Sequence, residues 1–390
     1  MSPLRIAVFL VVVSTVLGGA HYYVWARLVR DTALPEPWHS IASWTIGGLG
    51  LLIVAGLVSM RTLPRAISSP LLWVVYIWFG LIFFVLMLLG AVDLLRALSS
   101  LVTAAPPDPE RRAFLARLYG AIVGAGALSL GAFGLGNVLR PVAVKRVKVS
   151  LPGLPVAAGG FRIVQLTDVH IGPTIGKDFL DEVVAKVNAL EPDLVAITGD
   201  LVDGSVAELG QHVAPLGRLK AKEGVFFVTG NHEYYSGVDE WLAFLGTLGV
   251  RVLRNERVAI RGDQGFDLAG IDDASAAAHG HGHGADLPRA VAGRDTSRPL
   301  VLLAHQPKGI DLAERLGVDL QLSGHTHGGQ LFPWNFVVKL VYPFIAGLYR
   351  QGRTQVYVSE GTGYWGPPMR VGTSAEITHI ELLVAPALRS

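Results

Sequence analysis

Long runs of apolar residues, broken only by short charged or proline-bearing connectors, fill the first third of the chain. The runs at residues 6–24, 41–60 and 71–92 carry almost no charge, and a Gly- and Ala-rich run at 114–138 is the fourth. A helix of about 20 apolar residues crosses the hydrocarbon core of a bilayer. The pattern therefore predicts an all-α transmembrane region of about four helices over residues 1–140. Core helices of a soluble protein are the alternative, but the first three runs lack a polar face.

The pattern changes at about residue 144, where short β-rich runs begin to alternate with amphipathic stretches. Helical spacing of apolar residues predicts helices at 177–190, 206–219 and 238–248. Strands are predicted at 161–166, 194–198, 225–228, 267–271, 300–303, 320–322, 356–358 and 377–383. This alternation is typical of a layered α/β domain with much of its sheet buried, here predicted over residues 145–385.

Composition narrows the chemistry that any site can use. The 390 residues include no cysteine, so a disulfide framework and a thiolate metal site are both excluded. A formal net charge of +2, without a dense run of Lys and Arg, argues against a nucleic-acid groove. Any metal ion must therefore be held by oxygen and imidazole ligands.

Residue types that bind metal ions follow strand after strand in the second domain. Asp168 and His170 come just after the first predicted strand, and in an extended chain side chains two apart face the same way. The later strands are followed by Gly199-Asp200-Leu201-Val202-Asp203, Gly230-Asn231-His232-Glu233, His305 and Gly324-His325-Thr326-His327. Each motif is a weak signal alone, because a single Asp or His at a strand end is more often an ordinary turn residue.

Taken in this order, the motifs resemble the signature of the calcineurin-like metallophosphoesterases over residues 145–385. The whole chain is most similar to the membrane-anchored, bacterial-type members of that family. The resemblance implies a two-sheet sandwich flanked by helices, with four layers in the order αββα. It also implies two divalent cations, Mn, Fe or Zn, at the strand ends. Carboxylate, imidazole and amide donors are suited to these metals.

The same resemblance implies a role for each residue. Asp168, His170 and His327 would hold the first cation, Asn231, His305 and His325 the second, and Asp200 would bridge both. Two such cations would activate a shared water to attack phosphorus and would neutralise charge on the phosphoryl oxygens. His232 would stabilise the transition state or protonate the leaving oxygen, with Asp203 orienting it. A turn aspartate with a local backbone bond is the alternative for Asp203.

One position departs from a branch of the family. Phosphoprotein phosphatases carry a phosphate-gripping arginine after the second aspartate, whereas this chain has Gly204. The expected activity is therefore hydrolysis of a phosphomonoester or phosphodiester, with lipid-linked or other envelope-associated molecules as candidate substrates. Two other functions stay open. The chain could be a non-catalytic membrane scaffold or transporter that senses metal, or a nuclease, which its charge pattern disfavours.

Two segments near the motifs bear on the substrate. The aromatic and aliphatic stretch at 331–344 either lies in the membrane interface, guiding a lipid phosphate to the cations, or packs on the domain itself. The histidine- and glycine-rich run at 279–283 is expected to be a solvent loop. Tyr234, Tyr235 and Asp272 have either substrate-binding or packing roles.

Lys and Arg are shared almost evenly between the two ends of the spans, so the positive-inside rule leaves the orientation open. Residues 110–115, Glu-Arg-Arg-Ala-Phe-Leu, resemble a twin-arginine export signal. Such a signal predicts a catalytic domain on the outer side of the cytoplasmic membrane of a bacterial-type cell. Two ordinary interfacial arginines are the alternative.

Overall fold

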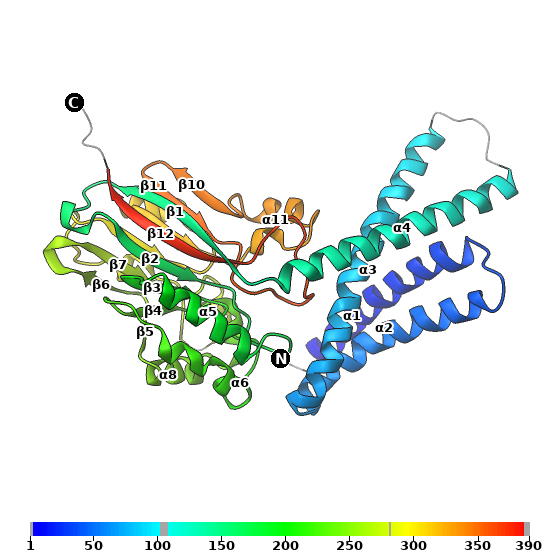
Figure 1. The fold of residues 1–390 in the computed structure, drawn as a ribbon, viewed down its shortest axis with the longest axis horizontal. Helices are drawn as coiled ribbons and strands as arrows, with labels where there is room; N and C mark the ends of the chain where they lie inside the picture. The colour runs from blue at the N-terminus through cyan, green and yellow to red at the C-terminus, as the bar shows by residue number, and fades with distance from the viewer. Residues whose placement is uncertain (1–2, 102–107, 281, 386–390) are drawn as a thin grey trace. The chain divides into compact units, whose positions relative to one another are not determined.

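The computed structural model describes residues 3–101, 108–280 and 282–385. The chain forms two compact units, each with its own secondary structure (Figure 1). Unit 1 consists of Met1–Gly136 with the short segment Gly366–Met369, and unit 2 consists of Asn137–Trp365 with Arg370–Ser390.

Unit 1 is helical. Its elements are α1 (Pro3–Trp25), the short π-helix η1 (Ala26–Arg30), α2 (Trp38–Thr62), α3 (Arg65–Ser100) and α4 (Pro109–Val138). Three helical stretches among the described residues are long and apolar enough to cross a membrane: Trp38–Ser59, Arg65–Ser100 and Pro109–Val138. They contain nearly all of the last three predicted spans, so the prediction of an all-α region with long apolar helices is confirmed.

The first predicted span, residues 6–24, lies within helix α1. Several side chains of α1 are outside the described set, and α1 is not one of the three candidate spans found among the described residues. The fourth crossing therefore stays a prediction.

The described part of unit 2 contains two six-stranded sheets. The first has the order β1 (Ala143–Leu151), β12 (Glu376–Val384), β2 (Phe161–Leu166), β3 (Leu194–Thr198), β4 (Val225–Val228), β5 (Val250–Val252). The second has the order β10 (Gly347–Gln351), β11 (Thr354–Val358), β9 (Leu320–Ser323), β8 (Leu300–Leu303), β7 (Phe266–Gly270), β6 (Glu256–Ile260).

The helices of unit 2 are short. The α-helices are α5 (Lys177–Ala189), α6 (Val206–Val213), α7 (Asn231–Ser236), α8 (Val238–Thr247), α9 (Leu287–Ala290), α10 (Ile310–Arg315) and α11 (Asn335–Val341). The 3-10 helices are η2 (Val156–Ala158), η3 (Ala214–Arg218), η4 (Gly262–Gln264), η5 (Ala276–His279) and η6 (His327–Gly329). The predicted helix at 206–219 is thus an α-helix followed by a 3-10 turn.

Strand β2 shows why both faces of the first sheet are buried. Ile163 belongs to the apolar core between the two sheets, whereas its neighbour Val164 packs with residues of α5, α6 and α8 on the outer face. Figure 1 shows these three helices on one side of the first sheet. Successive strand residues point to opposite faces, so a strand covered on both sides is apolar throughout. Helices α9 and α10 cover strands β7 and β8 of the second sheet. The predicted αββα layering is therefore confirmed.

The eight predicted strands correspond to β2, β3, β4, β7, β8, β9, β11 and β12. The four that the apolar pattern did not mark, β1, β5, β6 and β10, are the edge strands of the two sheets. An edge strand is partly exposed and blunted with polar residues, so its apolar signal is weak. Strand β1, for example, carries Lys145, Arg146 and Lys148.

The parallel strands fix where the site forms. Strands β2, β3 and β4 are parallel to one another, and so are β7, β8 and β9. The carboxyl ends of parallel strands meet at one edge of a sheet, and the loops that follow them commonly carry functional residues. The predicted metal ligands all follow β2, β3, β4, β8 and β9, with Asn231 at the start of α7 and His327 at the start of η6.

Candidate metal centre

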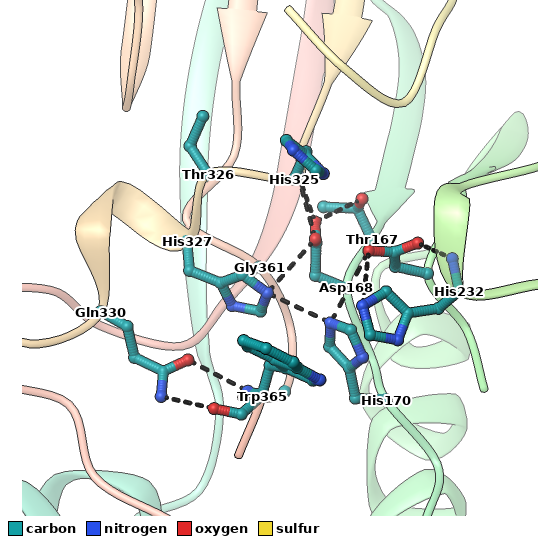
Figure 2. Close-up of polar contacts among 12 residues, drawn as sticks. Thr167, Asp168, His170, His232, His325, Thr326, His327, Gln330, Gly361 and Trp365 are labelled. Carbon is teal, nitrogen blue, oxygen red and sulfur yellow. Dashed lines mark hydrogen bonds and ion pairs between the residues drawn. The ribbon is translucent and has the colours of Figure 1, made fainter. Parts of the chain in front are cut away.

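Asp168, His170 and His327 form a first cluster of metal-ligand side chains, and all three are buried. His327 Nε2 lies 3.1 Å from His170 Nε2 and 3.4 Å from Asp168 Oδ1. Figure 2 shows these side chains pointing toward one another from the loops after β2 and β9. Three donors that converge in this way could hold one cation.

Asp200, His305 and His325 form a second cluster. His305 Nε2 lies 3.1 Å from Asp200 Oδ2 and 3.1 Å from His325 Nδ1. His305 Nδ1 is 2.8 Å from the carbonyl oxygen of Thr198, so Nδ1 donates and the lone pair of Nε2 faces the cluster. A neutral histidine in this tautomer is a competent metal ligand.

Asp200 belongs to the second cluster and also faces the first. Its Oδ2 is 3.1 Å from His305 Nε2 in the second cluster and 3.9 Å from His170 Nε2 in the first. Its Oδ1 accepts the backbone N–H of His232 at 2.9 Å, which fixes the orientation of the carboxylate. This position suits a carboxylate that is shared by two cations.

Asn231 gives independent evidence that cations fit here. Its Oδ1 is buried without a hydrogen-bond partner among the described residues, which costs about 1–3 kcal/mol unless a cation or water satisfies it. The nitrogen–nitrogen distance of 3.1 Å in each cluster is also close to that between two adjacent ligands of one ion, each about 2.1 Å from it. The donors are oxygen and nitrogen only, which fits Mn, Fe or Zn.

Electrostatics keep two of the imidazoles neutral. Burial and the charge of His305 lower the pKa of His325 to about 3, and burial and the charge of His170 lower the pKa of His327. His305 differs, because the charge of Asp200 and a hydrogen bond to it outweigh burial and raise the pKa of His305. Metal binding requires neutral imidazole, so a cation beside Asp200 would displace the proton of His305.

The backbone at the ligands is not the extended chain that the sequence suggested. Asp168 and His170 both have a φ of 52°, and φ is also positive at Asp200, His325 and His327. Residues other than Gly seldom adopt this region, although Asp and His do so more often than most, and the conformation costs about 1 kcal/mol or more each. Side chains two apart therefore converge because the chain turns sharply after each strand. Strain of this kind is typical of functional sites.

Glycines allow the loops after β3 and β4 to touch. A Cβ atom on Gly230 would overlap the backbone nitrogen and Oδ1 of Asp200. Gly199 has a φ of +83°, and a Cβ there would overlap the backbone of Gly230. The two glycines thus bring Asp200 and Asn231 next to each other.

His232 is oriented by Asp203. His232 Nδ1 lies 2.5 Å from Asp203 Oδ1, and its Nε2 lies 3.9 Å from Asp200 Oδ2. Burial lowers the pKa of His232, but the hydrogen bond to Asp203 and the charge of Asp200 outweigh it and raise the pKa to about 9. Asp203 Oδ1 is also 3.2 Å from His170 Nδ1. The carboxylate therefore orients two histidines, whereas the sequence suggested one.

Glu233 is a site residue to which the sequence assigned no role. Its buried carboxylate accepts the backbone N–H groups of Gly230, Asp200 and Leu201 at 2.6, 3.1 and 2.7 Å. Burial and the charge of Asp200 raise the pKa of Glu233 to about 7. It ties the loop after β3 to the start of α7. A Glu three residues after a helix N-cap is a signal that could have found it.

The loop after β11 supplies further residues that carried no sequence signal. Trp365 exchanges two hydrogen bonds with the side chain of Gln330, at 2.9 and 3.0 Å (Figure 2). Its exposed ring lies edge-on to His232, with the ring centres 5.6 Å apart. The buried guanidinium of Arg370 donates to the carbonyls of Gly363 and Glu360 and thereby fixes this loop.

Other residues near the motifs have mainly packing or structural contacts. Asp272 pairs with Arg254 at 2.9 Å, and buried Tyr234 stacks on His279 with ring centres 5.5 Å apart. Tyr235 is exposed, and its ring lies 5.3 Å from that of His232. In the run at 279–283, residue 281 is outside the described residues.

The matched family model is described as calcineurin-like phosphoesterase and covers residues 161–329. A transmembrane protein with metallophosphoesterase domain from Danio rerio is 36% identical over 96% of this chain and 89% of its own length. A protein of the same description from Bos taurus is 46% identical over 66% of this chain. An uncharacterized metallophosphoesterase from Campylobacter jejuni is 32% identical over 96% of this chain and 98% of its own length. The chain spans 61% of the bovine protein.

Proposed function

The chain belongs to the calcineurin-like phosphoesterase family, and on that premise we propose that unit 2 hydrolyses phosphomonoesters or phosphodiesters with two divalent cations. The position of Asp200 supports this most directly, because one of its oxygens lies within 3.9 Å of an imidazole nitrogen in each ligand cluster. A carboxylate shared in this way joins two metal positions into one centre.

In this proposal each residue keeps the role that the sequence suggested. Asp168, His170 and His327 hold one cation, Asn231, His305 and His325 hold the other, and Asp200 serves both. The bound pair would stabilise charge on the phosphoryl oxygens and lower the pKa of an attacking water. Glu233 and the strained loops would hold the ligand side chains in their positions.

His232 is proposed to donate a proton from Nε2 to the leaving oxygen. Its Nδ1 is engaged by Asp203, which leaves Nε2 directed at the centre. A proton donor held in place contributes about 10²–10⁴-fold to a rate. The rings of Trp365 and Tyr235 flank His232, so they would line the leaving-group side of the site.

Residues 1–140 are proposed as the transmembrane region and 145–385 as the catalytic domain. The substrate is proposed to be a lipid-linked or other envelope-associated phosphate ester, and the three candidate spans support an enzyme located at a membrane. The resemblance of residues 110–115 to a twin-arginine signal supports a cytoplasmic membrane of a bacterial-type cell, with the catalytic domain outside.

The first test is hydrolysis of bis-p-nitrophenyl phosphate and p-nitrophenyl phosphate by the purified full chain. With Mn²⁺ we expect turnover of at least one ester, a drop of about 10³-fold or more after chelation, and recovery when Mn²⁺ is restored, because the centre has no protein nucleophile to replace the cations. No hydrolysis with Mn, Fe or Zn would favour the scaffold alternative.

The variant His232→Ala is expected to slow hydrolysis about 10²-fold without loss of metal. The substituted residue keeps the backbone N–H that Asp200 accepts, so the ligands stay in place. The loss should be larger for phenyl phosphate than for p-nitrophenyl phosphate, whose leaving group needs less protonation. His279→Ala, which removes a nearby imidazole outside both clusters, is the control. Equal losses for the two esters, or loss of metal, would contradict the role.

A further inference from the structure

Helix α11 and the residues before it form an apolar surface that unit 2 leaves uncovered. Helix α11 contains no buried residue. Six large apolar side chains in the ten residues 332–341 are exposed: Phe332, Trp334, Phe336, Val337, Leu340 and Val341. The sequence left open whether this stretch packs on its own domain, and the exposure of these side chains argues against that. A patch of this kind on a folded protein is typical of an interaction site.

The charged residues near the α11 surface are basic, which favours a membrane as its partner over a protein surface of mixed charge. No Asp or Glu occurs from residue 331 to 359, whereas Lys339, Arg350 and Arg353 do. Lys339 is exposed on α11 itself, and Lys308 lies over the ring of Tyr342 at 5.0 Å. Aromatic and aliphatic side chains beside basic residues are typical of segments that lie in the headgroup region of a bilayer.

Unit 2 is tethered to a candidate membrane span by a short linker. Helix α4 is one of the three candidate spans, and only residues 139–142 separate its end from the start of β1. Four residues extend at most about 14 Å. If α4 crosses a bilayer, the linker keeps unit 2 close to the lipid surface at a high effective concentration. A modest apolar area then suffices for docking.

We propose that the α11 surface inserts its apolar side chains into the headgroup region of the bilayer. Tyr342, the residue after α11, connects this surface to the candidate metal centre. Its hydroxyl is 2.8 Å from His325 Nε2 and 3.1 Å from Gln306 Oε1. Docking would hold the centre close to the phosphate groups of lipids, while the apolar chains of those lipids stay in the membrane. This last consequence rests on the proposed function, whereas the docking itself does not.

The absence of cysteine allows a direct test with single spin labels on the full chain. Leu340 and Val156 are exposed apolar residues with matching exposed fractions of 86% and 85%, and Val156 lies in η2, outside the α11 surface. Each would be replaced in turn, Leu340→Cys and Val156→Cys. The labelled proteins would be reconstituted into vesicles of phosphatidylcholine and phosphatidylglycerol.

At position 340 we expect collisions with oxygen, which concentrates in lipid, to exceed those with a water-soluble nickel chelate, and the reverse at position 156. If the label at position 340 also collided more with the nickel chelate than with oxygen, as at position 156, the α11 surface would lie in water. Strong dipolar broadening between labels at 340 would mean that a second copy of the chain covers it. Either result would overturn the proposal.

A double variant, Leu340→Ser with Val341→Ser, tests the consequence for catalysis. Hydrolysis of bis-p-nitrophenyl phosphate should stay within about 2-fold of the parent, because neither side chain belongs to the centre. Hydrolysis of phosphatidic acid in vesicles should fall by about 10-fold, since docking loses two apolar side chains. Equal effects on both esters would refute a role in presenting lipid. An inactive parent enzyme would count against the proposed function and leave the spin-label result to decide the docking.

Discussion

Asp200→Asn is expected to lower turnover by about 10³-fold or more and to reduce the metal content of the protein below two equivalents. Asp200 Oδ2 lies 3.1 Å from an imidazole nitrogen of one ligand cluster and 3.9 Å from one of the other, so its charge is shared by both cation positions. An amide keeps the size of the side chain but offers one neutral oxygen. Losing several kcal/mol of charge stabilisation corresponds to a rate loss of this size.

Metal analysis by mass spectrometry after dialysis, together with rates on bis-p-nitrophenyl phosphate, would measure both effects. Asp263→Asn is the matched control, because Asp263 is exposed in η4 and contributes to neither cluster. It should leave rate and metal content unchanged. Two retained equivalents of metal in Asp200→Asn would contradict a shared carboxylate.

Gly230→Ala is expected to abolish activity although it adds only one methyl group. The new Cβ would overlap the backbone nitrogen and Oδ1 of Asp200, both held by hydrogen bonds. The loops after β3 and β4 must then separate, which moves Asn231 away from the centre. Overpacking of this kind costs roughly 1–3 kcal/mol.

Thermal unfolding and metal content would report the effect. For a domain of this size each kcal/mol lowers the melting temperature by about 2–4 °C. Gly246→Ala in α8 is the control, since a Cβ there has no neighbour within 4 Å and alanine favours the helix. It should be neutral or slightly stabilising. Full activity in Gly230→Ala would show that the two loops need not touch.

The fold was predictable wherever strands are buried on both sides. Strand β3, with Val195 in one core and Ala196 in the other, is apolar throughout and was found with its true ends. Strand β10 has no buried residue, and β5 has three residues, so neither produces a strong apolar pattern. An edge strand is held by pairing with a single neighbour, which leaves no apolar pattern of its own, and for β1 that neighbour is β12 at the other end of the domain.

The arrangement around the site was less predictable. Asp168 and His170 were identified from residue type and position after a strand, but their left-handed backbone was not. Glu233 acts through three backbone N–H groups from two loops, and such contacts exist only after the loops fold. Arg370 fixes a loop through carbonyl groups, which every residue carries and which therefore leave no trace in the sequence.

By its own pattern the sequence determined the region of long apolar helices, a layered α/β domain with much of its sheet buried, and the types of ligand at the strand ends. These follow from local hydrophobic period and from residue chemistry, which are properties of short segments. Only the tertiary structure decided which oxygen of Asp200 faces both clusters, that Asp203 orients two histidines, and that helix α11 exposes its apolar side chains. Each of these depends on distances between segments that are far apart in the chain, and such distances are set by packing of the whole unit.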